Sequence, residues 1–271
     1  MASTLLQISD PHFGTEQDVV VEALHRLARD QAPDLVVLSG DITQRARGSQ
    51  FRAARAFIDR LDPRALVAIP GNHDIPLYNL PARAFTPYAN YSRAFGVDLE
   101  PEFESPDLLV VCVNTTRPRR RKDGEVSQEQ IERVAKRMQR ATPSQLRIVV
   151  VHQPVLSIRV SDECNLLHGS RFAVPAWAEA GVDIIMGGHI HLPYVRPMRT
   201  AFASLAREVW TVQAGTAVSS RTREGVPNSV NIVRCFDPSS SRRCDVERWD
   251  FVTALGRFVH HATETLAFHD P

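Results

Sequence analysis

The sequence predicts an α/β protein with two β-sheets, because short apolar strands alternate with amphipathic helices in the first half and strands dominate the last third. A β-α-β-α-β order is typical of a sheet with helices packed outside it. The 271 residues, 43% hydrophobic and 23% charged, have the composition of an ordinary globular protein. Since neither an internal repeat nor a linker interrupts the chain, we expect a single domain over residues 1–271.

Apolar spacing defines the elements of the first two thirds of the chain. Continuous apolar runs, such as Asp34 to Gly40, predict strands buried on both faces. Apolar residues at helical spacing predict helices, one of which ends at Asp62-Pro63. Ser127 and Gln130 have the spacing of a capping box and mark the start of another helix. The predicted strands are 5–9, 34–40, 65–70, 108–114, 146–152 and 182–187, and the predicted helices are 17–31, 51–61 and 127–140.

The last third of the chain predicts strands at 210–214, 230–236 and 244–251 and then a helical segment at 254–271. The helix is inferred from an apolar stripe that has to be buried, either on its own domain or on a second subunit. The stripe consists of Leu255, Phe258, Val259, Ala262 and Leu266.

Residues 76–106 differ from their surroundings because prolines and aromatic residues alternate there. One interpretation is a surface excursion with a small core of its own. The other is a flap that forms one wall of a substrate cleft, since long insertions often carry function. We favour the flap slightly.

Charge and cysteine content restrict the environment and the partners. With 32 basic and 31 acidic residues the net charge is +1, so no overall field attracts nucleic acid or an anionic membrane. No apolar run approaches the ~20 residues that span a bilayer, and the start of the chain does not resemble a secretory signal. We therefore expect a cytoplasmic protein. Cys235 and Cys244 flank a turn-rich stretch and could face each other across a hairpin, with the reduced state favoured.

Histidine and aspartate gather where the predicted strands end. Ligands bind outside the carboxyl ends of strands in open α/β sheets, so these side chains are expected to converge. Mixed imidazole and carboxylate ligation suits Zn, Mn, Fe, Co or Ni, and no Cys-x-x-Cys pair indicates a thiolate site. The motifs are Asp10-Pro11-His12, Gly40-Asp41, Gly71-Asn72-His73-Asp74, Val151-His152 and Gly188-His189-Ile190-His191.

Each motif taken alone has a structural explanation. An Asp-x-His motif can cap a helix, Gly-Asp can form a turn, and a lone histidine can belong to the core. The Gly-His-x-His motif is more specific, because alternate residues of an extended segment point the same way. Independent structural explanations for all of these motifs are improbable, so their co-occurrence favours a metal site.

The order of the motifs resembles the calcineurin-like metallophosphoesterase superfamily over about residues 4–216. In detail it is similar to the bacterial branch that includes the class III cyclic nucleotide phosphodiesterases. The resemblance and the element pattern together imply a four-layer α/β/β/α sandwich of two mixed β-sheets flanked by helices. The segments most similar to that branch are Ile8 to Gly14, Pro70 to Asp74 and Gly188 to Pro193.

The resemblance implies metal ligands in two groups that share one bridging carboxylate. The first group is Asp10, His12 and His191, the second is Asn72, His152 and His189, and the bridge is Asp41. Two cations ~3.5–4 Å apart can clamp a phosphate, and a water shared between them can lose its proton near neutral pH. We expect that hydroxide to be the nucleophile, and Mn and Fe to be the native pair, with Zn an alternative.

Two further residues have catalytic roles implied by the resemblance. His73 would lie beside the scissile phosphate as a general acid or as a stabiliser of transition-state charge. Asp74 would orient the ring of His73, or it is a turn carboxylate; the two interpretations carry equal weight.

The expected function is metal-dependent hydrolysis of a phosphodiester, with 3′,5′-cyclic nucleotides the first substrates to try. The alternatives are a nucleotide pyrophosphatase or lipid-linked nucleotide hydrolase, or a phosphomonoesterase, because one metal centre supports all of these. A non-catalytic scaffold is disfavoured, since every ligand position of the superfamily pattern is kept. The expected partner is a small-molecule phosphoester, without nucleic acid or a membrane span, and a homodimer is an alternative to a monomer.

Two segments could line the substrate cleft. The basic run from Arg117 to Lys122 is interpreted as a solvated loop in preference to a polyanion-binding patch. The segment 153–172 should face the cleft and offers four polar side chains to a substrate, namely Arg159, Asn165, His168 and Arg171.

Overall fold

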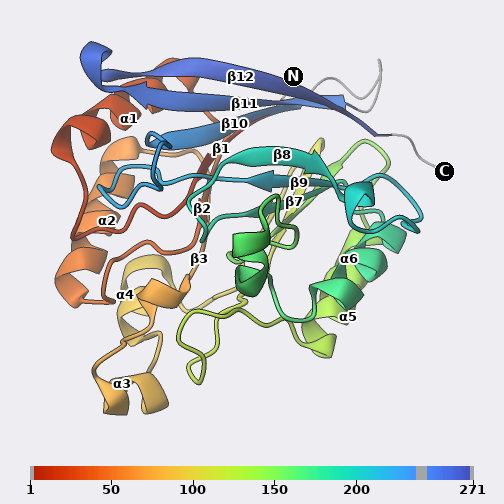
Figure 1. Cartoon of the computed structure of the whole chain (residues 1–271), viewed down its shortest axis with the longest axis horizontal. Coiled ribbons are helices and arrows are strands. Elements are labelled where there is room, and N and C mark those ends of the chain that lie inside the picture. The colour runs from red at the N-terminus through yellow and green to blue at the C-terminus, as the bar shows by residue number, and fades with distance from the viewer. Residues whose placement is uncertain (1–2, 236–242, 269–271) are drawn as a thin grey trace.

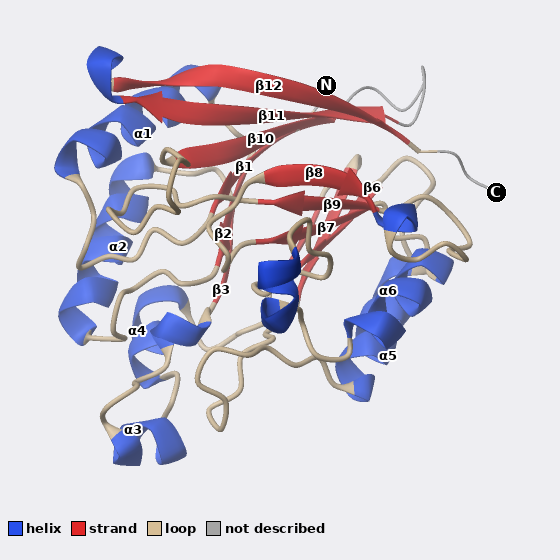
Figure 2. Cartoon of the chain, in the orientation of Figure 1, coloured by secondary structure: helices blue, strands red, loops and turns tan. Residues whose placement is uncertain are grey.

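Two six-stranded mixed sheets lie face to face and carry helices on their outer faces (Figures 1 and 2). The structure is a computed structural model that describes residues 3–235 and 243–268. Apolar side chains are buried in three groups, one between the sheets and one under each helical layer. The four-layer α/β/β/α sandwich expected from the sequence is therefore confirmed.

The first sheet has the order β12-β11-β10-β1-β2-β3. β1 pairs in parallel with β2, β2 pairs in parallel with β3, and β10 to β12 extend the sheet with antiparallel pairs. Helices α1, α2 and α4 bury apolar side chains against its outer face. The strands are β1 (Thr4–Ile8), β2 (Leu35–Ser39), β3 (Leu66–Ile69), β10 (Ser229–Cys235), β11 (Arg243–Val252) and β12 (Arg257–Ala267). The helices are α1 (Asp18–Gln31), α2 (Gly48–Leu61) and α4 (Ala89–Phe95).

The second sheet has the order β4-β5-β6-β7-β9-β8, and α5 and α6 cover its outer face. The indole of Trp177 in α6 is fully buried and donates a hydrogen bond of 3.3 Å to the carbonyl of Ile131 in α5. The expected capping box of Ser127 and Gln130 starts α5. The strands are β4 (Glu102–Glu104), β5 (Leu108–Cys112), β6 (Leu146–Val150), β7 (Ile184–Gly187), β8 (Tyr194–Pro197) and β9 (Trp210–Gln213), and the helices are α5 (Gln128–Met138) and α6 (Ser170–Glu179).

Successive side chains of the central strands face opposite sides of the sheet, which explains how each sheet packs on the other sheet and on its helices. Val37 of β2 and Val110 of β5 face the core between the sheets, whereas the neighbouring Val36 and Val111 face the helices. Each of these side chains is buried, and burying one contributes roughly 1.5–3 kcal/mol. Both faces of β2 and β5 are apolar, and the polar residue of β2, Ser39, stands at its end. No helix in the described part of the chain is long and apolar enough to cross a bilayer.

The prediction of a helix at 254–271 is wrong for residues 254–268, the part of this segment that the structure describes. Residues Arg257 to Ala267 form β12, which pairs antiparallel with β11. Phe258 and Leu266 are buried, but the residues between them are intermediate or exposed, so no helical stripe is buried. The apolar residues of this segment fit a period of two as well as a helical period, and the unpaired edge of β11 selects the strand.

Cys235 and Cys244 lie opposite each other in the register of β10 and β11, as their positions around a turn suggested. Both thiols are buried and free. Residue 236, the expected end of the strand, lies outside the described residues.

The segment 76–106 contains α3 (Leu80–Phe85), α4 and β4. Tyr91 of α4 is buried and donates a hydrogen bond of 2.7 Å to the carbonyl of Ala68, so this part packs on the first sheet. In α3, by contrast, no residue is buried, and Phe85 is 85% exposed. The flap interpretation of this segment stays a prediction.

We expect Phe258→Ala to lower the free energy of unfolding by about 3–5 kcal/mol, the usual cost of truncating a core phenylalanine. Phe258 is 5% exposed, and its ring centroid lies 5.7 Å from that of Phe251. Urea denaturation measures the change. Glu264→Ala, at an exposed position of the same strand, is the control and should change stability by no more than about 0.5 kcal/mol. Equal effects of the two substitutions would show that β12 does not contribute Phe258 to the core.

Candidate metal centre

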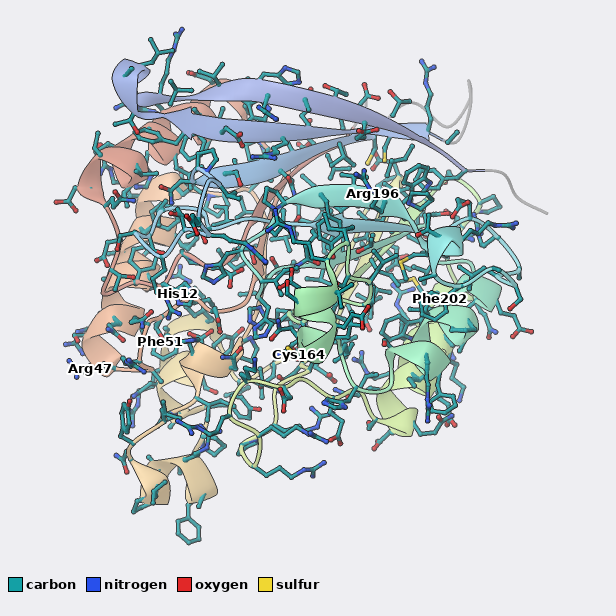
Figure 3. The ribbon with its side chains drawn as sticks, in the orientation of Figure 1. His12, Arg47, Phe51, Cys164, Arg196 and Phe202 are labelled. Atoms are coloured by element: carbon teal, nitrogen blue, oxygen red, sulfur yellow. The ribbon has the colours of Figure 1, made fainter. Side chains whose placement is uncertain are left out.

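The strand-end motifs of both sheets meet at one edge of the sandwich. β1, β2 and β3 of the first sheet lead into the residues at 10–12, 41 and 72, and β6 and β7 of the second sheet lead into those at 152 and 189–191. Figure 3 marks His12 among these loops. The parallel direction of these strands brings their carboxyl ends together, as the sequence predicted.

Asp10, His12 and His191 form the first ligand group. Their ligand atoms lie within 4.8 Å of one another. Nε2 of His191 is 3.3 Å from Oδ1 of Asp10 and 3.2 Å from Nε2 of His12. Three donor atoms therefore converge on one point, from motifs that are far apart in the chain.

Asp41, His152 and His189 form the second ligand group, again with ligand atoms within 4.8 Å of one another. Oδ1 of Asp41 is 3.3 Å from Nε2 of His152, and its Oδ2 is 3.8 Å from Nε2 of His12 in the first group. Asp41 thus reaches both groups, the position required of a bridging carboxylate.

Unpartnered buried atoms test whether metal ions fit here. Within the described residues, several buried ligand atoms lack any hydrogen-bond partner; among them are Asp10 Oδ1, Asn72 Oδ1, His152 Nε2 and His189 Nδ1. Leaving such an atom unsatisfied costs about 1–3 kcal/mol, so their concentration at one point requires an explanation. Oxygen and imidazole donors suit divalent first-row metals. The residues fit two divalent metal ions, which would satisfy these atoms.

The remaining polar atoms of the ligands are held by the protein. Nδ1 of His152 donates to the carbonyl of Ser39 at 2.8 Å, which leaves Nε2 free. Oδ2 of Asp10 accepts from the hydroxyl of Ser9 at 2.7 Å and from the backbone N–H of His189 at 3.0 Å, which leaves Oδ1 free. Such outer partners fix the tautomer and the direction of a ligand before an ion binds.

Several ligands occupy the left-handed backbone region, where non-glycine residues are uncommon. Their φ angles are 50° at Asp10, 42° at His12, 49° at Asp41, 71° at His189 and 57° at His191. Gly71 is required beside them because a Cβ atom there would lie 2.1 Å from the backbone nitrogen of Asp41. The close approach of Gly71 to the backbone of Asp41 and the left-handed φ angles together direct the ligand side chains into the site.

Burial determines the protonation of the ligand imidazoles. It lowers the pKa of His12 to about 3 and that of His189 to about 3, so both rings are neutral at pH 7 and able to coordinate. For His152 burial also opposes the charged form, but the Asp41 carboxylate outweighs it and raises the pKa to about 9. A metal ion at Nε2 of His152 therefore has to displace a proton.

His73 lies beside the ligand groups, but Asp74 does not orient its ring. Nδ1 of His73 is 2.9 Å from the backbone carbonyl oxygen of Gln44, which holds the ring. The buried Asp74 carboxylate accepts from the backbone N–H groups of Ile42, Thr43 and Gly71 at 2.8–2.9 Å. The turn-carboxylate interpretation fits these contacts, and the ring-orienting role is wrong. Asp74 ties the loop after β2 to the loop after β3.

Sequence reasoning missed Arg221 and the side chain of Gln44. Nη1 of Arg221 donates to Oε1 of Gln44 at 2.8 Å and lies 3.4 Å from Nε2 of His73. The carbonyl of Arg221 also accepts a hydrogen bond from Nδ1 of His191. Neither residue lies in one of the strand-end motifs that the sequence analysis singled out.

An open pocket of about 230 Å³ lies over the ligands. Its lining includes Asp41, Asn72, His73, His189, His191 and Arg221. Of the four polar side chains that the segment 153–172 offers to a substrate, Asn165 lines this pocket, whereas Arg159, His168 and Arg171 do not. A phosphoester in the pocket would touch both ligand groups, His73 and Arg221.

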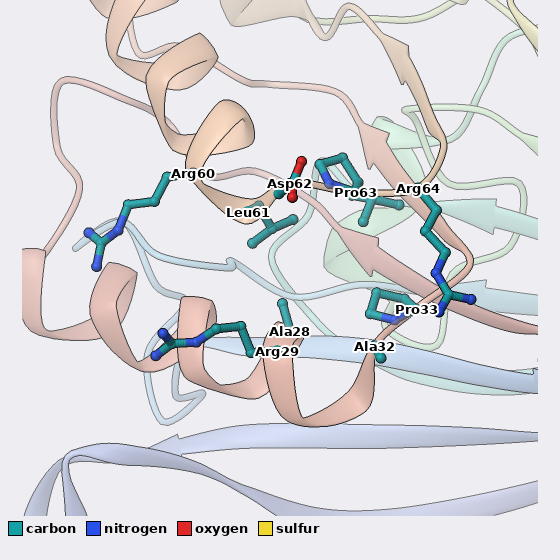
Figure 4. A pocket seen from close by; sticks show the side chains of 10 residues that line it. Ala28, Arg29, Ala32, Pro33, Arg60, Leu61, Asp62, Pro63 and Arg64 are labelled. Atoms are coloured by element: carbon teal, nitrogen blue, oxygen red, sulfur yellow. The ribbon is translucent and has the colours of Figure 1, made fainter.

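A different pocket lies at the opposite edge of the first sheet, where α1 and α2 end (Figure 4). It measures about 360 Å³ and contains Arg29, Arg60 and Arg64 around Leu61. Arg60 and Arg64 form ion pairs with acidic neighbours. No histidine lines this pocket.

Comparisons with known proteins agree with this geometry. Residues 3–193 match the family described as calcineurin-like phosphoesterase. A curated protein of Synechococcus sp., named a probable cyclic nucleotide phosphodiesterase, is 23% identical over 207 residues, which cover 72% of this chain and 76% of that protein. A dimetal phosphatase of Danio rerio has a TM-score of 0.70 at 12% identity, with 98% of this chain and 99% of that one covered. A purple acid phosphatase from yellow lupin seeds has a TM-score of 0.68 at 14% identity, with 98% and 54% covered. At these identities the structural likeness shows the fold.

We expect Asp41→Ala to abolish binding of both ions, because its carboxylate reaches both groups, whereas Asn72→Ala and His189→Ala should impair the second ion. Elemental analysis of metal-replete protein measures the ions per chain. His73→Ala is the matched control: it should keep both ions and lower turnover by about 10²–10⁴-fold, the usual contribution of a general acid. Loss of metal from His73→Ala would show that His73 belongs to the ligand set.

Proposed function

This chain belongs to the calcineurin-like phosphoesterase family and is a metal-dependent phosphoester hydrolase, and we propose that it hydrolyses a phosphodiester. The observation that carries the proposal is the pair of ligand groups joined by Asp41, with His73 and Arg221 on the wall of the same open pocket. We propose 3′,5′-cyclic nucleotides as the first substrates to try, which the name of the Synechococcus relative supports.

In the proposed site, Asp10, His12 and His191 hold one ion, Asn72, His152 and His189 hold the other, and Asp41 bridges them. When bound, the two ions supply positive charge to the phosphate and a nucleophile from water at neutral pH. The protein fixes the geometry, because Ser9, Ser39 and the Arg221 carbonyl orient ligands through hydrogen bonds. We propose Mn and Fe as the native pair, with Zn an alternative.

His73 acts through Nε2 in this proposal. Because Nδ1 donates to the carbonyl of Gln44, Nε2 is the atom that can reach a substrate. A proton on Nε2 would serve the leaving oxygen, as a general acid does.

Arg221 binds the phosphate in this proposal. Oε1 of Gln44 accepts a hydrogen bond from Nη1 of Arg221 and so holds the guanidinium. The other donors of the Arg221 guanidinium have no partner among the described residues. An arginine with free donors beside a metal site suits the planar, paired contacts that phosphate oxygens offer. The backbone carbonyl of Arg221 holds Nδ1 of His191. Arg221 therefore links the proposed phosphate contact to the metal site.

We expect Arg221→Gln to lower kcat/KM by about 10²–10³-fold, the usual effect of removing one donor that stabilises transition-state charge. The backbone carbonyl that holds His191 is retained, so the metal content should not change. Arg64→Gln, which removes the same charge at the opposite edge, is the control and should leave kcat/KM unchanged. Equal losses of kcat/KM in the two variants would show that Arg221 contributes only its charge and makes no specific contact with the phosphate.

A substrate panel with Mn present tests the reaction itself. We expect turnover of bis(p-nitrophenyl) phosphate and of a cyclic nucleotide, and loss of both on chelation with recovery on addition of Mn. The panel contains cyclic AMP, a 2′,3′-cyclic nucleotide, a nucleotide diphosphate lipid and a phosphomonoester. Activity confined to the monoester or to the lipid diphosphate would contradict the phosphodiester proposal and leave the metal site standing. No activity with any of them would favour a non-catalytic scaffold.

A further inference from the structure

One carboxylate on the wall of the metal pocket belongs to neither ligand group. Asp162 lines the pocket of about 230 Å³ together with Asp41 and His189. Two metal ions would offset the charge of Asp41, but Asp162 is not among the residues that could hold them. An uncompensated carboxylate on this wall would repel the phosphate of a substrate, because juxtaposed like charges weaken binding. The charge of Asp162 therefore has to be offset by the protein.

Asp162 belongs to a short 3₁₀ turn, η2 (Val160–Asn165), which lies between β6 and α6. Figure 3 labels Cys164, another residue of this turn. Of the six residues of η2, Asp162 alone is buried, and Asn165 also lines the metal pocket. A charged side chain, and not an apolar one, therefore anchors this part of the pocket wall to the rest of the protein.

The cation that offsets Asp162 is Arg223. Nη1 of Arg223 donates to Oδ2 of Asp162 at 2.9 Å and to the carbonyl of Ile190, between two metal ligands, at 3.3 Å. The side chains of the pair are 22% and 7% exposed, so their attraction is screened less than that of a surface pair. Among the described residues, no other cation forms an ion pair with Asp162. One guanidinium thus joins the turn η2 to the ligand motif at 188–191.

The loop that carries Arg223 is held on both sides of it by hydrogen bonds. Before Arg223, the backbone N–H of Arg221 donates to Oγ of Ser219 at 3.1 Å, and the carbonyl of Arg221 accepts from the hydroxyl of Thr216 at 3.1 Å. After it, the backbone N–H of Val226 donates to the carbonyl of Arg223 at 2.9 Å. The guanidinium of Arg223 is therefore presented to Asp162 from a fixed backbone.

We propose that Arg223 is a positioning residue of the phosphoester site, which neutralises Asp162 so that the turn η2 forms part of the pocket wall without repelling an anionic substrate. The inference rests on the proposed function. Loss of Arg223 leaves a net negative charge on the wall, whereas loss of the Asp162 carboxylate leaves a net positive charge. The two substitutions therefore have opposite effects on the affinity for an anion, although each breaks the same ion pair. An ion pair that only stabilised the fold would give two effects of the same sign.

The test is calorimetric binding of inorganic phosphate to protein loaded with two Mn²⁺ ions per chain, with the metal content of each variant measured by elemental analysis. We expect Arg223→Gln to weaken phosphate binding at least about tenfold, because the Asp162 carboxylate is left unpaired beside the anion. Asp162→Asn should bind phosphate at least as tightly as the unmodified protein. The double variant Asp162→Asn/Arg223→Gln and the conservative variant Arg223→Lys should both stay within about threefold of it, since neither changes the net charge of the wall.

Arg234→Gln is the matched control, because it breaks a partly buried ion pair with Glu247, at 2.7 Å, on two strands of the first sheet outside the pocket. It should leave phosphate affinity unchanged. Weaker binding in Asp162→Asn, a double variant no better than Arg223→Gln, or no phosphate binding by the unmodified protein would overturn the inference. Turnover of bis(p-nitrophenyl) phosphate decides the proposed function separately: the expected order of affinities without turnover would contradict that function and leave the role of Arg223 standing.

Discussion

The structure depends on buried ligand atoms that have no hydrogen-bond partner among the described residues. Asp10 Oδ1, Asn72 Oδ1 and His152 Nε2 are buried and unsatisfied, and they point at one region between the carboxyl ends of two sheets. Each unsatisfied atom alone would destabilise the folded protein. Together they form a site that bound cations would stabilise. The two-sheet sandwich makes this convergence achievable, because each sheet brings only part of the ligand set and neither could enclose two ions alone.

Backbone strain accompanies that convergence. Asp10, His12, Asp41, His189 and His191 all have positive φ angles. Left-handed non-glycine residues cost of order 1–3 kcal/mol each and persist where the surroundings over-determine them. Here the surroundings are hydrogen bonds from Ser9 and to Ser39, and the carboxylate of Asp74 that ties two loops together. Because the ligands are held rigidly, substrate specificity is left to other side chains on the pocket wall, such as Arg221.

Sequence reasoning succeeded where a short stretch of sequence determines the outcome, as in the apolar strands and the Asp and His motifs that follow them. Apolar runs predicted the central strands, and Asp and His are both good ligands and among the residues that tolerate a left-handed backbone. It left two roles open for Asp74 and missed Arg221, because the partners of these side chains are backbone groups and loops distant in the chain. At 254–268 the apolar spacing fits two periods, and only the free edge of β11 decides between them. The basic run was ambiguous because ion pairing with Glu125 depends on the folded loop.

Electron paramagnetic resonance of the protein loaded with two Mn²⁺ ions per chain tests the bridged centre most directly. Two ions joined by the carboxylate of Asp41 are close enough for their spins to couple, so we predict a low-temperature spectrum of a coupled pair, with hyperfine spacing half that of an isolated ion. The coupled signal should already be present in the resting protein, because the ligand groups are held before substrate binds. The spectrum of isolated Mn²⁺ at every loading would contradict the account.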